Sequence, residues 1–303
     1  MIDFVDSFSS YISRIEGYPR LSSSPRSIKR FLFRGQADKS WSLIPTLARI
    51  NSPDLDEGGC QELPCLFEKN LVSQAKRELP TIFHDGLQPL DLLARLQHFG
   101  VPTRLLDVSE NPLTALYFAC SGELDRDGEV LVFADRSDDL TDYPIRHAVA
   151  ESYLFAKGSF TQLFAFYDDV IARPYFASQR HLCNERTAKE KAQWIKECCD
   201  GPMLVMASKT IDRQAAQAAN YILFPNIVCG DGETACFGNS IRAISKEVKS
   251  GSGLLFDRII IPLQCKQKMV ESLRLMGVTR GSLFPDNVEA VCADILERCK
   301  LLN

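Results

Sequence analysis

The sequence lacks the short motifs that mark the common metal and nucleotide sites. It has no Cys-x-x-Cys pair, and its four histidines lie far apart, at positions 84, 98, 147 and 181, so no zinc site is expected. It has no Walker A loop, no Gly-x-Gly-x-x-Gly turn and no Gly-x-Ser-x-Gly elbow. These absences argue against a P-loop NTPase, a Rossmann dinucleotide fold and an α/β-hydrolase, and no metal cofactor is expected.

Long apolar runs and an excess of basic residues are missing as well. No run approaches the roughly eighteen apolar residues that span a membrane, and the first residues carry acids early, unlike a secretory signal. The eleven cysteines are therefore expected to be reduced thiols of a cytoplasmic protein that does not bind a membrane. The net charge is −4, so nucleic acid would have to bind through a local basic patch.

Hydrophobic patterns predict interspersed strands and helices. Short runs of apolar residues predict strands at residues 31–33, 128–134, 221–224 and 257–262. Amphipathic spacing predicts helices within residues 1–20, 61–79, 266–276 and 288–296. Strands and helices do not alternate regularly, which favours an α+β fold over a doubly wound sheet.

The chain shows no internal repeat and no convincing linker. We therefore expect a single domain over residues 1–303, with a helical N-terminal segment at 1–25 and a helical insertion at 145–200. The charged section 185–196 of this insertion is the best candidate for a lid.

The segment 92–120 concentrates polar residues between two apolar helices. The helices are predicted at residues 92–96 and 113–119, and the turn between them carries Thr103, Arg104, Asp107, Ser109 and Asn111. Asn111 or Ser109 could cap the second helix, and Pro112 fits its first position. Polar groups held against a core need partners, so a site is expected here. Arg104 and Asp107 fit either a buried ion pair that locks the turn or a polar network beneath a ligand.

Two further residues are open to a structural and a functional reading. Arg34 follows the apolar strand 31–33 and precedes a glycine, so it either reaches into a cleft or pairs with a carboxylate at the sheet edge. His98 fits either a histidine that stabilises the turn or a general base.

Several blocks of sequence resemble the FRG domain family. The opening block is Phe33, Arg34, Gly35 and Gln36, followed by Trp41, Leu43, Pro45 and Arg49. The central block, residues 97–119, reads QHFGVPTRLLDVSENPLTALYFA. A third block contains Arg213 and Gln217, and a C-terminal block covers residues 259–286. Together they span residues 30–297. Val108 stands where many relatives carry an aromatic residue, and Ala218 and Ala219 stand where glycine is usual.

The FRG family is remotely similar to ADP-ribosyltransferases, which implies a mixed or split sheet flanked by helices and NAD as the substrate. By this analogy Arg34, with Gly35 and Gln36 beside it, would bind the diphosphate, because guanidinium matches phosphate oxygens. The other candidate NAD contacts are Thr103, Arg104, Ser109, Asn111, Tyr117 and Gln217. The candidate catalytic residues are Glu129, Asp107 and His98, with Glu233 a weaker alternative to Glu129.

The resemblance implies an NAD-dependent toxin or antiviral effector that modifies a protein or a nucleic acid. A toxin would also have an inhibitory antitoxin partner. The alternative is a non-catalytic sensor that binds a nucleotide or nucleic acid through the same arginines. A metal-dependent nuclease is less well supported, because Asp138, Asp139 and Asp142 read as a solvated loop without EF-hand spacing.

Overall fold

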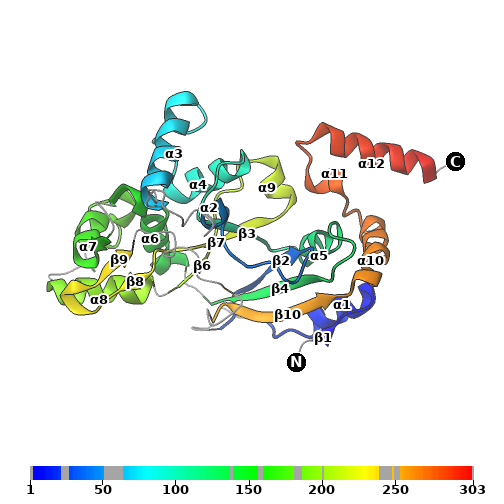
Figure 1. The fold of residues 1–303 in the computed structure, drawn as a ribbon, viewed down its shortest axis with the longest axis horizontal. Coiled ribbons are helices and arrows are strands. Elements are labelled where there is room, and N and C mark those ends of the chain that lie inside the picture. Colours follow the sequence, from blue (N-terminus) through cyan, green and yellow to red (C-terminus); the bar gives the residue numbers. More distant parts are fainter. Residues whose placement is uncertain are drawn as a thin grey trace, which may run out of the picture.

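The computed structural model describes residues 3–21, 27–50, 64–136, 139–155, 160–180, 186–199, 201–238, 248 and 253–301. Its centre is a seven-stranded sheet in the order β1-β10-β4-β2-β3-β7-β6, beside a smaller sheet in the order β5-β9-β8 (Figure 1). The described strand pairs are antiparallel except β1 with β10. The expected combination of a mixed sheet with flanking helices is confirmed.

The strands of the large sheet come from distant parts of the chain. They are β1 (Asp3–Phe4), β2 (Arg30–Gln36), β3 (Leu105–Ser109), β4 (Gly128–Asp135), β6 (Met203–Val205), β7 (Ala219–Leu223) and β10 (Leu255–Ile261). The small sheet contains β5 (Phe160–Gln162), β8 (Val228–Cys229) and β9 (Cys236–Gly238). The four strands predicted from apolar runs are thus confirmed as β2, β4, β7 and β10.

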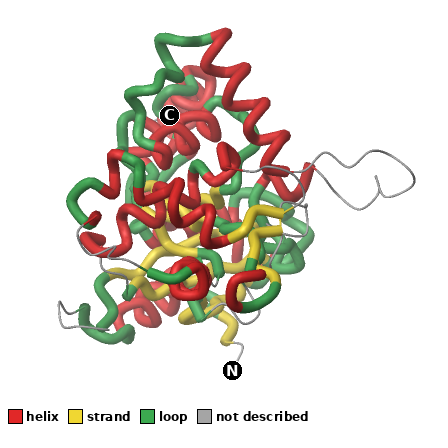
Figure 2. The backbone as a smooth tube through the Cα atoms, turned by 90° about the vertical axis from the view of Figure 1, so that its left-hand side faces the viewer, coloured by secondary structure: helices red, strands yellow, loops and turns green. Residues whose placement is uncertain are grey.

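Helices surround the strands on several sides (Figure 2). They are α1 (Phe8–Glu16), α2 (Thr46–Ile50), α3 (Pro64–Glu78), α4 (Pro89–His98), α5 (Pro112–Cys120), α6 (Asp139–Ala150), α7 (Leu163–Ile171), α8 (Ala188–Cys198), α9 (Asp212–Ala216), α10 (Leu263–Leu275), α11 (Arg280–Leu283) and α12 (Val288–Leu301). The predicted loop at Asp138, Asp139 and Asp142 is wrong from Asp139 onward, where α6 begins, while Asp138 lies outside the described residues.

The polar turn predicted between α4 and α5 is in fact a central strand. Strand β3 pairs along its whole length with β7 and touches β2 at one position, Phe33 opposite Ser109. Its apolar residues Leu105, Leu106 and Val108 are buried because both faces of the sheet are covered here. Tertiary packing therefore overrides the polar local composition.

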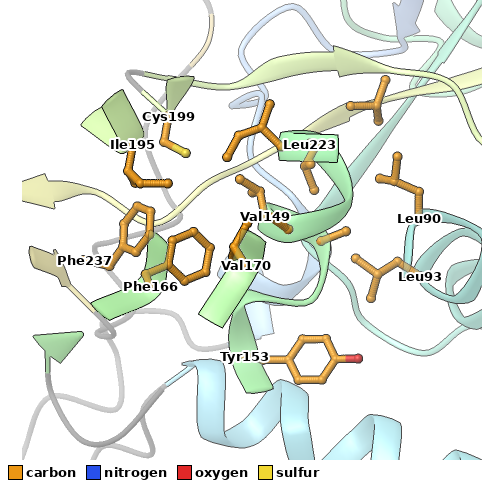
Figure 3. Close-up of a cluster of buried hydrophobic side chains, with 14 of the residues drawn as sticks. Leu90, Leu93, Val149, Tyr153, Phe166, Val170, Ile195, Cys199, Leu223 and Phe237 are labelled. Atoms are coloured by element: carbon orange, nitrogen blue, oxygen red, sulfur yellow. The ribbon is translucent and has the colours of Figure 1, made fainter. Parts of the chain in front are cut away.

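One face of the large sheet carries two separate groups of helices. Over β10, β4 and β2, a first apolar cluster joins the sheet to α1, α5 and α10. Over β3, β7 and β6, a second cluster joins it to α4, α6, α7 and α8. Figure 3 shows this second cluster, in which the rings of Phe166 and Phe237 meet edge to face at 4.9 Å beside Ile195. The opposite face packs through Leu32, Leu106, Leu131 and Ile222.

The expected helical insertion at 145–200 contains α7 and α8 but also strand β5. Its charged section is mostly α8, which begins at the capping residue Thr187, whose side chain and that of Glu190 form a capping box. Ala192 and Ile195 are buried in the second cluster, so α8 is anchored to the core on one face.

Gly35 allows α5 to lie directly on β2. A Cβ atom at Gly35 would meet the carbonyl oxygen of Ala115 at 1.8 Å, and one at Gly128 would meet that of Ala119 at 2.2 Å. Both contacts involve backbone, which cannot turn away as a side chain can. The glycine of the Phe-Arg-Gly sequence is thus required for helix-on-strand packing.

We expect Gly35→Ala to lower the free energy of unfolding by about 3 kcal/mol, because α5 must shift to admit the methyl group. Urea denaturation measures the effect. Gly86→Ala is the control, since Gly86 meets only the side chain of His84, at 3.0 Å. Equal stability of the two variants would contradict the packing role of Gly35.

His147 on α6 makes stability depend on pH. Its ring is buried between Tyr143 and Tyr175, and burial lowers its pKa from 6.5 to about 4, with Asp91 opposing and Arg146 adding to the shift. The unfolded chain binds the proton more readily, so this contribution is intact above pH 6.5 and is lost as the pH falls towards 4. Urea titrations across this window should show a steeper loss for the wild type than for His147→Phe.

No helix within the described residues is long and apolar enough to cross a membrane. Six cysteines in the described part of the chain are free thiols: Cys120, Cys199, Cys229, Cys236, Cys265 and Cys292.

Candidate functional site

A cavity of about 360 Å³ lies on the helix-covered face of the large sheet, between the two apolar clusters. Its floor is formed by residues of β2, β3 and β7: Phe33, Gly35, Asp107, Ser109, Ala219 and Tyr221. Helices α4, α5 and α9 supply the walls, with Gln97, His98, Thr114, Phe118, Arg213 and Gln214. Trp41, which is 46% exposed, also lines the cavity.

Arg34 lies where β2 and β3 separate. The two strands pair only at Phe33 and Ser109, so the next carbonyl on β3, that of Asp107, has no partner on the β2 backbone. The guanidinium of Arg34 takes this place, and its Nη1 donates to the Asp107 carbonyl oxygen at 2.6 Å. Its Nε is buried and has no partner among the described residues. Arg34 is among the residues that line the cavity, and its role in ligand binding stays a prediction.

Three effects act on the pKa of the Arg34 guanidinium. Burial lowers the pKa of its guanidinium, the negative charge of Asp107 opposes this, and the positive charge of Arg49 adds to it. An anion in the cavity would offset the cost of burying this charge.

Asp107 is the acidic residue of the described cavity lining, and its side chain is exposed. Its Oδ1 accepts a hydrogen bond from Gln97 Nε2 at 2.8 Å, and Gln97 Oε1 accepts one from the Thr103 hydroxyl at 2.6 Å. Thr103 is buried and does not line the cavity. It therefore orients Gln97, which in turn orients the carboxylate.

His98 and Arg213 are held by the segment between α11 and α12. His98 Nε2 lies 3.8 Å from Asp286 Oδ2, and the Arg213 guanidinium lies 4.3 Å from the centre of the Phe284 ring. Gln217 Nε2 donates to the Leu283 carbonyl at 3.0 Å. Burial lowers the pKa of His98, with Asp286 opposing and Arg213 adding to the effect, so its ring is neutral at pH 7.

Arg104 is not brought to the cavity and does not pair with Asp107. Its side chain is fully buried and forms a two-pronged ion pair with Glu68 of α3, with Nη2 2.5 Å from Oε2. Nη1 also donates to Asn226 Oδ1 at 2.9 Å. The ion pair expected between Arg104 and Asp107 is therefore wrong: the two side chains point to opposite sides of the sheet, and Arg104 pairs with Glu68 instead.

Glu129 and Gln36 lie opposite each other on β4 and β2, on the face of the sheet away from the cavity floor. Glu129 is fully buried, and its Oε2 accepts from Arg258 Nε at 2.6 Å. Neither residue lines the cavity, and Glu233 is exposed beside the small sheet.

A family model matches the segment of the chain that supplies many of the elements around this cavity. Residues 29–128 match the FRG domain. No curated protein and no solved structure was found to match the chain. The FRG match includes β2, α4, β3 and α5, but it ends before α9, so Arg213, Gln214 and Gln217 lie beyond it. The expected extension of the family blocks to residue 297, and the single domain over 1–303, stay predictions.

The remaining predicted residues of the FRG segment have structural partners. Asn111 is the N-cap of α5, with its Oδ1 accepting from Leu113 N at 2.9 Å, and Pro112 follows at the first helical position, as expected. The Ser109 hydroxyl donates to the Gln217 carbonyl at 2.6 Å. Tyr117 is buried in the first cluster and does not line the cavity, whereas its neighbour Phe118 does.

Sequence reasoning missed Thr114 and Gln214 as cavity residues, whereas Phe118 was considered with Tyr117 as a residue that could stack on a ligand ring. Trp41 and Arg213 entered only through the family resemblance. Thr114 and Phe118 lie in an apolar helix where core positions are the normal expectation. No three His, Cys, Asp or Glu side chains within the described ranges come together as a metal site would require.

Ala218, which follows Gln217 beside the cavity, has an unusual backbone conformation. Its φ is +46°, a left-handed conformation that costs a residue with a Cβ atom about 1 kcal/mol. We expect Ala218→Gly to raise the free energy of unfolding by about 0.5 kcal/mol, measured in urea, since glycine's greater freedom in the unfolded chain offsets part of the gain. Ala216→Gly, in the helix α9, is the control and should destabilise.

Proposed function

We propose that the cavity binds NAD and that the chain is an ADP-ribosyltransferase-like enzyme. The observation that carries the proposal is Arg34, which lines the cavity and whose buried Nε has no partner among the described residues. Arg213 adds a second cation from α9. Two arginines are well suited to the two phosphates of a dinucleotide, because guanidinium donors match phosphate oxygens in pairs.

The rest of the lining suits the rings of the same ligand. Phe33, Phe118, Tyr221 and Trp41 supply aromatic surface, and the volume of about 360 Å³ falls in the usual range for small-molecule sites. Trp41 is partly exposed, so a ring held against it would lie at the mouth of the cavity.

Transfer of ADP-ribose breaks the bond between ribose C1′ and the nicotinamide nitrogen, and positive charge develops at C1′. The exposed carboxylate of Asp107, oriented by Gln97, would stabilise that charge. His98 is neutral and could accept the proton of the attacking group as its bond to C1′ forms. The acceptor would be a protein or nucleic acid, and the role of toxin or antiviral effector rests on the family resemblance.

A second candidate is a nucleotide-binding protein that does not turn NAD over. It is favoured by the position of Glu129, which is paired with Arg258 on the face of the sheet away from the cavity floor. No glutamate is among the described residues that line the cavity. The same arginines would then serve recognition alone.

One experiment distinguishes the two proposed functions. The full chain is incubated with cell lysate and with NAD that is labelled in its adenosine half. A transferase releases nicotinamide and places label on a macromolecule, and Asp107→Asn should lose both reactions while still binding NAD. The control is Asp168→Asn, an exposed carboxylate on α7 that pairs with Lys191 outside the cavity. Binding without nicotinamide release would favour the second candidate, and no binding of NAD, ADP-ribose or ADP would overturn both.

A further inference from the structure

Besides Arg34, two residues that line the cavity each carry a buried polar atom with no partner among the described residues. These atoms are the hydroxyl of Thr114, whose residue is 1% exposed, and Oε1 of Gln214, whose residue is 6% exposed. Both residues line the cavity, from α5 and α9 respectively. Buried polar atoms in folded proteins almost always have hydrogen-bond partners. Because both residues line the same cavity, a ligand bound there can supply the missing partners.

The protein fixes the side chain of Gln214. Its Nε2 donates to the hydroxyl oxygen of Tyr221 at 3.1 Å, and Tyr221 is held on β7 opposite Asp107. With the amide nitrogen engaged, Oε1 remains as a fixed acceptor. It would therefore select a ligand group that carries an N–H or O–H donor.

The hydroxyl of Thr114 makes no hydrogen bond to the backbone of its own helix. A threonine inside a helix commonly donates to a carbonyl one turn earlier, but no such bond is present for Thr114. The hydroxyl can therefore donate to a ligand acceptor. Together the two side chains offer one acceptor and one donor to the same ligand.

We propose that these two residues recognise a planar edge on which an amino group lies next to a hydrogen-bond acceptor. Gln214 Oε1 accepts from the amino group, and the Thr114 hydroxyl donates to the neighbouring oxygen or ring nitrogen. This inference rests on the proposed nucleotide binding and leaves Arg34 for the phosphates. Two groups of NAD carry this pattern: the carboxamide of nicotinamide and the N6–N1 edge of adenine.

The same arrangement predicts which ligands are rejected. A carboxylate in place of the carboxamide would bring a negative oxygen against Gln214 Oε1, and so would the carbonyl of hypoxanthine in place of the adenine amino group. Either change leaves two acceptors facing each other without a proton between them. A site built around a buried hydrogen bond discriminates strongly against an analogue that cannot form it.

Calorimetric titration of the full chain with four probes tests the proposal. The probes are NAD, nicotinic acid adenine dinucleotide, nicotinamide hypoxanthine dinucleotide and ADP-ribose. We expect the wild type to bind NAD on the order of 100-fold more tightly than one of the two altered dinucleotides, and the weaker one identifies the recognised group. Gln214→Leu and Thr114→Val should lose this preference, whereas Gln193→Leu, on the exposed side of α8, should keep it.

A second measurement does not depend on any ligand. Thr114→Val removes a buried hydroxyl without changing the shape of the side chain, so it should raise the melting temperature of the free protein. Equal affinity of the wild type for NAD and both altered dinucleotides would overturn the inference, as would an unchanged preference in Gln214→Leu. If NAD binds through Arg34 in that case, the proposed function stands. If none of the four probes binds, the proposed function fails and the inference with it.

Discussion

Arg34→Ala is expected to weaken NAD binding on the order of 100-fold, because a buried, charge-assisted contact to phosphate contributes about 2–3 kcal/mol. The substitution removes the unpartnered Nε donor and the Nη1 bond to the Asp107 carbonyl. Titration calorimetry measures the affinity, and thermal unfolding shows whether the variant remains folded.

Two further variants complete this test: one keeps the charge of Arg34 without its donor geometry, and the other is a control on the same strand. Arg34→Lys keeps the positive charge but loses the planar set of donors, so its affinity should lie between those of Arg34→Ala and the wild type. Arg30→Ala is the control on the same strand, since Arg30 pairs with Asp135 outside the cavity. If Arg34→Ala is folded and binds NAD as the wild type does, Arg34 is only a partner of the sheet.

Glu68→Ala is expected to lower the free energy of unfolding by about 3–5 kcal/mol, because it leaves the fully buried Arg104 guanidinium without its counter-charge. Asn226 would still accept one hydrogen bond from Arg104, but an amide oxygen does not neutralise the cation. Equilibrium unfolding in urea at pH 7 measures the loss.

A double substitution distinguishes loss of the charge pair from loss of packing. Glu68→Leu combined with Arg104→Met removes both charges and retains apolar volume, so it should recover much of the stability that Glu68→Ala loses. The exposed pair of Lys209 and Glu110 is the control, and Lys209→Ala should change stability by less than about 1 kcal/mol. A loss of that small size for Glu68→Ala would show that Arg104 does not need its partner.

Local sequence signals predicted those features of the fold that depend on neighbouring residues. The apolar runs gave β2, β4, β7 and β10, and the Asn111-Pro112 pair gave the start of α5, because a cap and its helix are adjacent in the chain. Strand β3 was not predicted, since Arg104, Asp107 and Ser109 resemble a turn. Its strand conformation depends on pairing with β7, more than 100 residues away.

The cavity could be predicted only in part, for reasons of strand geometry. Every residue of β4 is buried, so its sequence does not reveal which side chains face which side, and Glu129 was expected at the site although it lies on the other face. The partner of Arg104 is separated from it by 36 residues and could not be inferred from spacing. The sequence named Arg34 as a candidate but left its partner open, because the separation of β2 from β3 next to it depends on distant strands.

Thr114 and Gln214 could not be predicted as cavity residues for a different reason. Each is a single polar residue within an ordinary helical pattern, and nothing in the sequence distinguishes it from a residue with an internal partner. Only the geometry reveals that their buried oxygens have no partner in the described residues and that both line the same cavity.

The most direct test of NAD binding in this cavity uses the fluorescence of the two tryptophans of the chain. Trp41 lines the cavity, whereas Trp194 packs against Tyr167 and Phe176 in the second cluster. The fluorescence of Trp194→Phe, which retains Trp41, should change saturably as NAD is added, and that of Trp41→Phe should not. A saturable change carried by Trp194 alone, or none in either variant at millimolar NAD, would contradict NAD binding in this cavity.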